Sequence, residues 1–210
     1  MAAHSAPKRT YAPRMAAEER REHLLDCALR VLGREGFYNV SIEAVAKEAG
    51  VSRPVVYDAY GGLEALLNAL LDRTQKRALR QVLAVLKDIG APEDVDAWLV
   101  DGTTRVIAMM QQDPDVWRPI LGLVRGAPRD VRDRIEDTRT VIRRYLAVAI
   151  EAGLQLRGTH GLDADLLSHI VMVSLEEFGR LVLEEPPQYE NERIIDALRT
   201  LLAAFGSQRA

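Results

Sequence analysis

The chain has 210 residues, of which 48% are hydrophobic, 28% are charged and 5% are aromatic, with a formal net charge of −3. A chain of this size can bury a substantial core, which aliphatic side chains must build because aromatic ones are scarce. No apolar run approaches the roughly 18–20 residues of a membrane span, and the N-terminus lacks the apolar segment of a secretory signal. We therefore expect a cytoplasmic protein with no membrane partner. Its one cysteine, Cys27, excludes an internal disulfide, and its apolar neighbours predict a buried thiol.

The acidic net charge is unevenly distributed. Residues 1–62 contain nine basic and eight acidic side chains, a net charge of +1, whereas the rest of the chain contains 19 basic and 23 acidic ones, a net charge of −4. Residues 1–17 are interpreted as a flexible basic arm, in which Lys8, Arg9 and Arg14 either follow a DNA strand or stay solvated. The N-terminal end is thus the better candidate for a nucleic-acid contact.

The sequence after this arm predicts helices only. A first helix covers about residues 17–34, two short ones start at residues 42 and 53, and a long one covers residues 63–89. Further helices are expected over residues 93–112, 114–124, 128–156, 163–184 and 189–205. Since no stretch alternates polar and apolar residues with a period of two, the prediction is an all-α protein without a sheet.

Residues 41–60 predict a helix-turn-helix, the unit that places its second helix in the major groove of DNA. Ala46 leaves room where the two helices touch, and Gly50 suits a turn at positive φ. Ser52 is positioned to cap the second helix, and Pro54 falls in its first turn, where a missing N–H costs nothing. An ordinary helical hairpin in a bundle is the alternative interpretation.

Several residues in and beside this segment are candidate DNA contacts. They are Ser41, Ser52, Arg53, Pro54, Val55, Tyr57 and Leu63. Arg53 is expected at a guanine edge or, as second choice, at a phosphate. Pro54 and Val55 suit thymine methyl groups, and the hydroxyl of Tyr57 suits a phosphate. Ser41 is expected to cap its helix, to contact a phosphate, or both.

The second half of the chain contains candidates for a ligand site. They are Trp98, Met109, Met110, Trp117, Tyr145, Glu177 and Phe178. Large apolar and sulfur-bearing side chains can line a pocket, although the same spacing also suits plain core. Glu177 stands in an otherwise apolar helical stripe, where a carboxylate needs an arginine, a second subunit or a cationic ligand. The neighbouring Glu176 is expected to form an ordinary ion pair with Arg180.

The last two predicted helices suggest a subunit interface. The helix at residues 163–184 is apolar nearly all round, which indicates burial on both sides. Two such helices suit a four-helix bundle across a two-fold axis, which predicts a homodimer. The candidate interface residues are Leu166, Ile170, Val173, Leu181, Ile195, Leu198 and Leu202. The alternative is that both helices bury only against their own chain.

No feature of the sequence points to catalysis. It has no Ser, His and Asp set in a supportive context, no glycine loop for phosphate and no metal-ligand spacing, and its four histidines are scattered. We therefore expect no enzyme activity, no metal site and no cofactor.

The N-terminal motifs resemble those of the TetR family, the tetracycline-repressor-like regulators. The resemblance covers about residues 18–70 and rests on Gly36-Phe37, Ser41-Ile42-Glu43-Ala44-Val45-Ala46, Ala49-Gly50-Val51-Ser52, Tyr57-Asp58-Ala59-Tyr60 and Glu64-Ala65-Leu66-Leu67. It implies a three-helix DNA-binding domain, taken as residues 18–62, and a helical ligand-binding and dimerisation domain, taken as residues 63–210. It further implies a homodimeric repressor that a small molecule releases from a palindromic operator. The apolar candidate residues suggest a hydrophobic or aromatic effector.

Two residues depart from the family pattern. Leu63 stands where the family usually has a lysine that contacts phosphate, so only the N-terminus of the following helix remains to bind phosphate there. Asp58 stands where a neutral or basic residue is common. Its carboxylate would weaken binding beside a phosphate, could specify a cytosine through its amino group, or stays in solvent. A ligand-independent DNA-binding regulator and a dimeric helical adaptor without DNA binding are the alternative functions.

Overall fold

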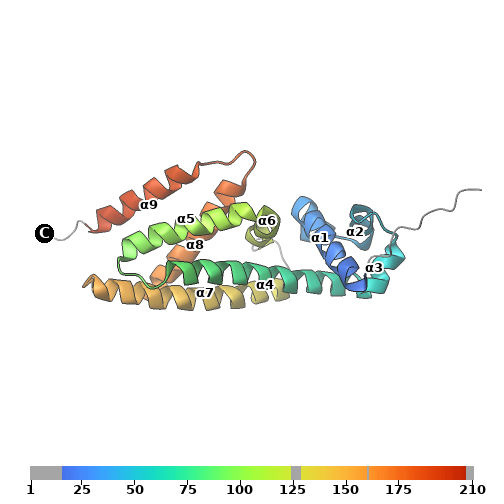
Figure 1. The fold of residues 1–210 in the computed structure, drawn as a ribbon, viewed down its shortest axis with the longest axis horizontal. Helices are drawn as coiled ribbons and strands as arrows, with labels where there is room; N and C mark the ends of the chain where they lie inside the picture. The colour runs from blue at the N-terminus through green and yellow to red at the C-terminus, as the bar shows by residue number, and fades with distance from the viewer. Residues whose placement is uncertain (1–15, 124–128, 160, 207–210) are drawn as a thin grey trace, which may run out of the picture.

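The expected all-α fold is confirmed by the computed structural model, which describes residues 16–123, 129–159 and 161–206. Residues 1–15 of the predicted arm lie outside these ranges, and no strand occurs within them. The helices are α1 (Ala17–Glu35), α2 (Ile42–Glu48), α3 (Arg53–Tyr60), α4 (Leu63–Ile89), α5 (Val95–Gln112), α6 (Pro114–Leu123), α7 (Arg129–Leu156), α8 (Ala164–Leu183) and α9 (Asn191–Gly206). Figure 1 shows an elongated molecule with α1, α2 and α3 at one end and α5 to α9 in the larger body.

The three N-terminal helices share one apolar core. Leu24 and Val31 of α1, Val45 of α2 and Val56 of α3 are fully buried in it. Cys27 is also fully buried, as its apolar neighbours predicted, and this burial raises the pKa of its thiol. A short 3₁₀ turn, η1 (Phe37–Asn39), connects α1 to α2. The small unit that results is held by side chains from all three helices.

Helix α4 belongs to both parts of the molecule. Near its start, Leu66 is fully buried against the N-terminal core, and Arg73 forms an ion pair with Asp26 of α1 at 2.8 Å. Near its end, Leu86 is buried in the body, where α4 packs against α5 and α7. One continuous helix therefore connects the two parts.

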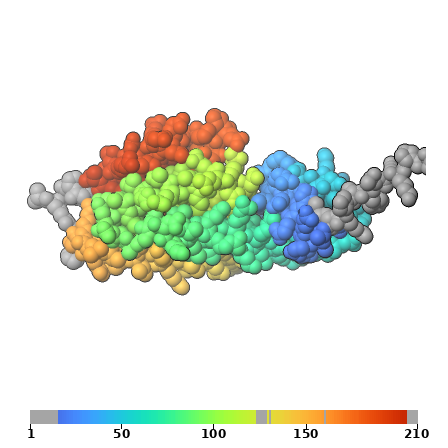
Figure 2. All heavy atoms as spheres, in the orientation of Figure 1, coloured from blue at the N-terminus to red at the C-terminus, as the bar shows by residue number. Residues whose placement is uncertain are grey.

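The body is built around α8, which packs against α5 and α7. Helix α9 lies on α5 and forms a ridge along one side of the molecule (Figure 2). The amides of Gln111, near the end of α5, and Asn191, at the start of α9, exchange two hydrogen bonds of 2.8 and 3.2 Å. The C-terminal end of α5 thus meets the N-terminal end of α9, and the two helices run antiparallel.

Capping residues explain where two of the body helices begin. The Oδ1 atom of Asp94 accepts from the backbone N–H groups of Asp96 and Ala97 at 2.9 and 3.3 Å, so α5 begins at Val95 rather than at residue 93. Asp163 caps α8 in the same way. Within the part of the chain that the structure describes, no helix is both long and apolar enough to cross a membrane.

Gly153 of α7 provides a test of how tightly α7 packs on α5. A Cβ atom at this position would lie 2.8 Å from Cβ of Val95, which is attached directly to the backbone of α5 and cannot rotate away. We predict that Gly153→Ala lowers the free energy of unfolding by about 1–3 kcal/mol, measured by denaturant titration. Gly122→Ala in α6 is the control, because a Cβ atom there meets nothing within 4 Å. Equal stability of the two variants would contradict the prediction.

Candidate DNA-binding surface and ligand cavity

The turn between α2 and α3 has the geometry that the sequence predicted. Gly50 has a φ of 65°, the left-handed conformation that glycine adopts without strain. The N–H of Val51 donates to the carbonyl of Ala46 at 3.0 Å and closes the turn. At the start of α2, the hydroxyl of Ser41 accepts from the N–H of Ala44 at 3.1 Å, so its predicted capping role is confirmed.

Ser52 stands at the N-cap position of α3, but its side chain makes no capping bond, which corrects the prediction. The reason is local. An N-cap side chain accepts from the second or third N–H of the helix, and the second residue here is Pro54, which has none. The third, Val55, donates its N–H to the carbonyl of Ser52 at 3.0 Å. Ser52 is exposed, so its hydroxyl is available to another partner.

Helix α3 has one buried and one exposed face. Val56 and Tyr60 face the core, with 0% and 8% of their surface exposed. Among the predicted DNA contacts, Ser52, Arg53, Pro54 and Tyr57 are exposed, and Val55 is half-buried. Helix α3 lies at the end of the molecule away from the body (Figure 1), and its exposed face therefore belongs to that end.

Tyr60 locks α3 onto α1. Its hydroxyl donates to the carbonyl of Arg21 at 2.8 Å, and the guanidinium of Arg21 lies 4.3 Å from the centre of its ring. Arg21 also donates to the carbonyl of Ala59. Burial raises the pKa of the Tyr60 phenol. These contacts hold the exposed face of α3 in a defined orientation.

Two acidic residues of α2 were not anticipated from the sequence. Glu43 lies 3.7 Å from Arg53, and both side chains are largely exposed. Glu48 accepts from Arg30 at 2.8 Å and from Arg34 at 3.0 Å, which ties α2 to α1. These hydrogen bonds lower the pKa of Glu48. Glu43 thus lies beside the principal candidate for base contact, while Glu48 has a structural role.

The two departures from the family pattern lie at the same end of the molecule. Leu63, the first residue of α4, is half-buried and packs on the hydrophobic core. Asp58 is exposed on α3. Neither adds positive charge to this surface, so any phosphate bound near Leu63 would depend on the backbone N–H groups at the start of α4.

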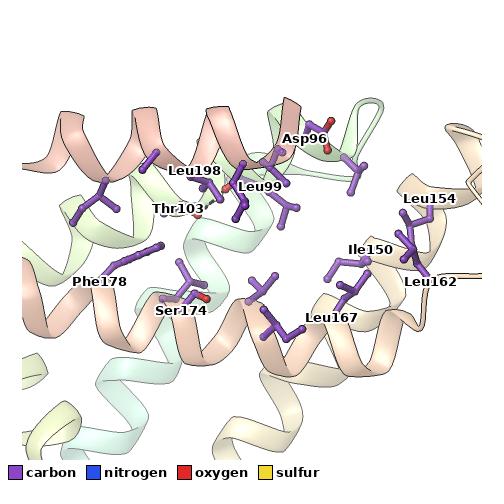
Figure 3. Close-up of a pocket in the computed structure, with 18 of the residues that line it drawn as sticks. Asp96, Leu99, Thr103, Ile150, Leu154, Leu162, Leu167, Ser174, Phe178 and Leu198 are labelled. Atoms are coloured by element: carbon purple, nitrogen blue, oxygen red, sulfur yellow. Dashed lines mark hydrogen bonds between the residues drawn. The ribbon is translucent and has the colours of Figure 1, made fainter. Parts of the chain in front are cut away.

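A cavity of about 940 Å³ lies between α5, α7, α8 and α9. Figure 3 shows Phe178 near one end, Leu154 and Leu162 near the other, and Leu198 of α9 facing Ser174 of α8 across the space. Most of the lining residues are aliphatic, including Leu99, Ile150, Leu154, Leu167, Leu175 and Leu198. A space of this size and character can hold a small organic molecule.

The structure places most of the predicted ligand residues elsewhere. Of the seven candidates, only Phe178 lines the cavity. Trp98, Met109, Met110 and Trp117 are buried in the core, with at most 8% of their surface exposed. The indole N–H groups of Trp98 and Trp117 are also engaged, donating to the carbonyl of Gly90 and to Gln81, each at 2.9 Å. These four residues therefore stabilise the body rather than line the cavity.

The two remaining candidates, Tyr145 and Glu177, do not line the cavity. Tyr145 is 40% exposed, and its hydroxyl donates to the carbonyl of Leu86 at 3.4 Å. Glu177 does not line the cavity and forms an ion pair with Arg180 on its own helix. The carboxylate with an interhelical partner is Glu176, which binds Arg139 of α7 at 2.9 Å. Burial raises the pKa of Glu176, an effect larger than the opposing one of Arg139.

The predicted interface residues fall into three groups. Leu166, Ile170 and Val173 are 54–58% exposed and form an apolar stripe along α8. Ile170 also lines the cavity, as do Leu181, Leu198 and Leu202. Ile195 is buried within its own chain, with 6% of its surface exposed, so it is not available to a partner. Among the seven predicted interface residues, the exposed ones are therefore all on α8.

Comparison with known proteins agrees with this architecture. A family model described as "Bacterial regulatory proteins, tetR family" matches residues 24–70. The HTH-type transcriptional regulator BetI of Brucella suis biovar 1 is 28% identical over 196 residues, which cover 82% of this chain and 96% of that protein. A TetR-like regulator from Rhodococcus sp. RHA1 superposes with a TM-score of 0.73 at 18% identity, covering 94% of this chain and all of that one. The structure of AibR with isovaleryl coenzyme A and operator DNA superposes with a TM-score of 0.71 at 17% identity, covering 87% and 97%.

The ion pairs of Glu48 with Arg30 and Arg34, which connect α2 to α1, predict that stability depends on pH. The pKa of Glu48 is lowered in the folded protein from an ordinary value near 4.5, so its contribution is present above that pH and is lost as the pH falls further. We predict that Glu48→Gln lowers the melting temperature at neutral pH. On acidification, the melting temperature of this variant should fall less than that of the wild type. The measurement is thermal unfolding followed by circular dichroism from pH 7 to pH 3. Glu64→Gln, at the start of α4, is the control, and identical profiles for the wild type and Glu48→Gln would contradict the prediction.

Proposed function

Because the chain belongs to the TetR family of transcriptional regulators, we propose that it acts as a homodimeric repressor that releases a palindromic operator when a small molecule binds its cavity. The chain is a DNA-binding regulator with a helix-turn-helix. A cytoplasmic location follows from the proposal, because operator DNA lies there in bacteria.

The observation that supports DNA binding most directly is the two-faced packing of α3. Val56 and Tyr60 hold one face in the core, and Arg53 and Tyr57, with more than half of their surface exposed, are left on the other. In the helix-turn-helix this free face enters the major groove. Arg53 is suited to a guanine edge, and Tyr57 is suited to a phosphate.

A few contacts must supply most of the affinity, because the surface has little net positive charge. Ser41 and Ser52 offer hydroxyl groups beside the N-termini of α2 and α3, although Ser41 already accepts one capping bond. Glu43 lies 3.7 Å from Arg53 and adds a negative charge to the face that would meet DNA. The exposed Asp58 opposes phosphate contacts nearby. We therefore expect a second subunit to contribute essential binding energy.

The partner in this proposal is a second copy of the chain, docked on α8. Leu166, Ile170 and Val173 recur at helical spacing and are more than half exposed, and an isolated subunit would leave this stripe in water. A two-fold contact along α8 would bury the stripe and set the separation of the two α3 helices.

The cavity supports control by a small molecule. Its walls come from α5, α7, α8 and α9, with no residue from α4. The side chain of Ile89, at the end of α4, lies beside Gly102 of α5. A Cβ atom added to Gly102 would lie 3.3 Å from Cδ1 of Ile89, so the two helices are in close contact there. Gly102 adjoins Thr103, which lines the cavity. A ligand would thus act on α4 through α5, and it shifts the equilibrium only if it binds the DNA-incompetent arrangement more tightly.

The central test is selection of operator DNA from a random double-stranded pool. We predict enrichment of one palindrome, with half-sites about one helical turn, or roughly 34 Å, apart. Arg53→Gln should then weaken binding of that palindrome on the order of tenfold to a hundredfold in a mobility-shift titration, because a bidentate base contact is lost. Arg105→Gln, an exposed arginine of α5, is the control. An absence of enrichment even at low salt would favour the adaptor alternative.

The dimer face has its own test. We predict that Val173→Glu converts the dimer to a monomer in analytical ultracentrifugation, because it places a charge in the apolar stripe of α8. Val173 is 55% exposed in the single chain, so the fold of the subunit should survive. The comparison variant is Val148→Glu, on a residue of α7 that is 72% exposed. Dissociation by Val148→Glu and not by Val173→Glu would place the interface on α7 instead.

A further inference from the structure

The cavity is elongated along α8, and most of its length is lined by apolar side chains. Along α8 its lining extends from Leu167 to Leu181, which corresponds to about 21 Å at the rise of an α-helix. The stretch between these residues is lined chiefly by aliphatic side chains of α5, α8 and α9. Of the polar groups in this middle part, the hydroxyl of Thr103 already donates to the carbonyl of Leu99 at 2.7 Å. A long apolar chain fits this stretch better than a compact polar molecule.

Three charged residues line the cavity, and two of them neutralise each other. Asp96 and Arg157 form an ion pair at 2.7 Å, with each side chain about 30% exposed. They belong to the end of the cavity that contains Leu154 and Leu162, where Figure 3 places Asp96. A charged ligand group at this end would have to break the existing pair.

Arg193 is the third charged residue, and it lies at the opposite end. The N–H of Gln188 donates to the carbonyl of Leu181 at 3.0 Å, which brings the segment after α8 back beside the Leu181 end of the cavity. Tyr189 follows directly, and the guanidinium of Arg193 lies 5.0 Å from the centre of its ring. Both side chains line the cavity. With two arginines and one aspartate, the lining carries a net charge of +1.

The guanidinium of Arg193 is positioned but not neutralised. Among the ion pairs between described residues, none includes Arg193, although Glu190 and Glu192 are near it in sequence and do not line the cavity. Contact with an aromatic face restricts the guanidinium and leaves its N–H groups at the edge, where a carboxylate or phosphate can accept two of them. Arg193 is also exposed, so the head group of a ligand could remain at the mouth of the cavity.

We propose that the effector is an elongated amphiphile with an anionic head, which binds with its head at Arg193 and its apolar chain along α8 toward Leu154. This assignment rests on the proposed function, because it names the class of ligand for the same cavity. A free fatty acid and a fatty acyl thioester of an anionic carrier share this chemistry. A cationic amphiphile is disfavoured, because Glu177 lies outside the cavity and Asp96 is already paired.

The test compares ligands that have the same chain and different heads. Dodecanoate, dodecanoyl coenzyme A, dodecanol and dodecyltrimethylammonium are titrated into the full-length protein by calorimetry, each below the concentration at which it forms micelles. We expect an anionic probe to bind at least about tenfold more tightly than the neutral and cationic ones. The comparison between the free acid and the thioester identifies the source of the anionic head.

Two variants connect the binding to the cavity. Arg193→Gln should weaken the anionic probe about tenfold and leave dodecanol unchanged, whereas Arg199→Gln on the same helix, which pairs with Asp196 outside the cavity, should change nothing. Ala197→Trp should exclude every probe by filling the space beside α8. Circular dichroism confirms that each variant is folded before it is compared.

The proposal is overturned if dodecyltrimethylammonium binds as tightly as dodecanoate, or if neither Arg193→Gln nor Ala197→Trp changes binding. It is also overturned if no probe binds to the intact dimer, a result expected if the partner subunit fills the space between α8 and α9. Operator binding, measured on the same preparation, separates this failure from failure of the proposed function. A protein that selects an operator but ignores every probe retains the regulatory function and loses only the effector class.

Discussion

The arrangement of the whole molecule depends on the burial of α4 at both of its ends. Leu66 is fully enclosed with the side chains of α1, and Leu86 is enclosed in the body. An α-helix that is packed at both ends transmits a displacement of one end to the other, because its hydrogen-bonded backbone does not compress. The position of α3 relative to the body is therefore tied to the packing around the far end of α4. This constraint makes a cavity in the body relevant to a surface at the other end of the molecule.

Helix α8 serves two surfaces at the same time. One side of it lines the cavity with Leu167, Val171 and Phe178, and another side presents Leu166 and Val173 to solvent. Ile170 belongs to both, since it is 54% exposed and also lines the cavity. A second subunit on the stripe would cover part of the cavity, so ligand binding and dimer geometry would affect each other reciprocally. Helix α8 would thus couple the proposed effector to the proposed partner subunit.

The electrostatics of the DNA-binding end differ from those of a strongly basic protein. Residues 1–62 carry a net charge of +1, Glu43 pairs with Arg53, and Leu63 leaves the start of α4 without a cationic side chain. Long-range attraction to DNA is weak under these conditions, and the correct sequence must supply a larger share of the affinity. In the proposed dimer, weak long-range attraction would favour the operator over non-specific DNA and make both half-site contacts necessary.

Features that depend only on neighbouring residues were predictable from the sequence. Gly50, Ser41 and the limits of α4 could be predicted because turn conformation, capping and helix breaking act over a few residues. Which side of a helix meets which neighbour depends instead on how the helices pack in the folded chain. Glu176 and Glu177 differ by one position, or about 100° around α8, and it is Glu176 that meets Arg139 because α7 lies on that side. In the same way, Trp98 and Met109 became core whereas Leu99 and Leu198 line the cavity, because the placement of α9 on α5 defines the space. Apolar character predicts burial, but the direction in which a side chain points is set by packing between helices that are distant in the sequence.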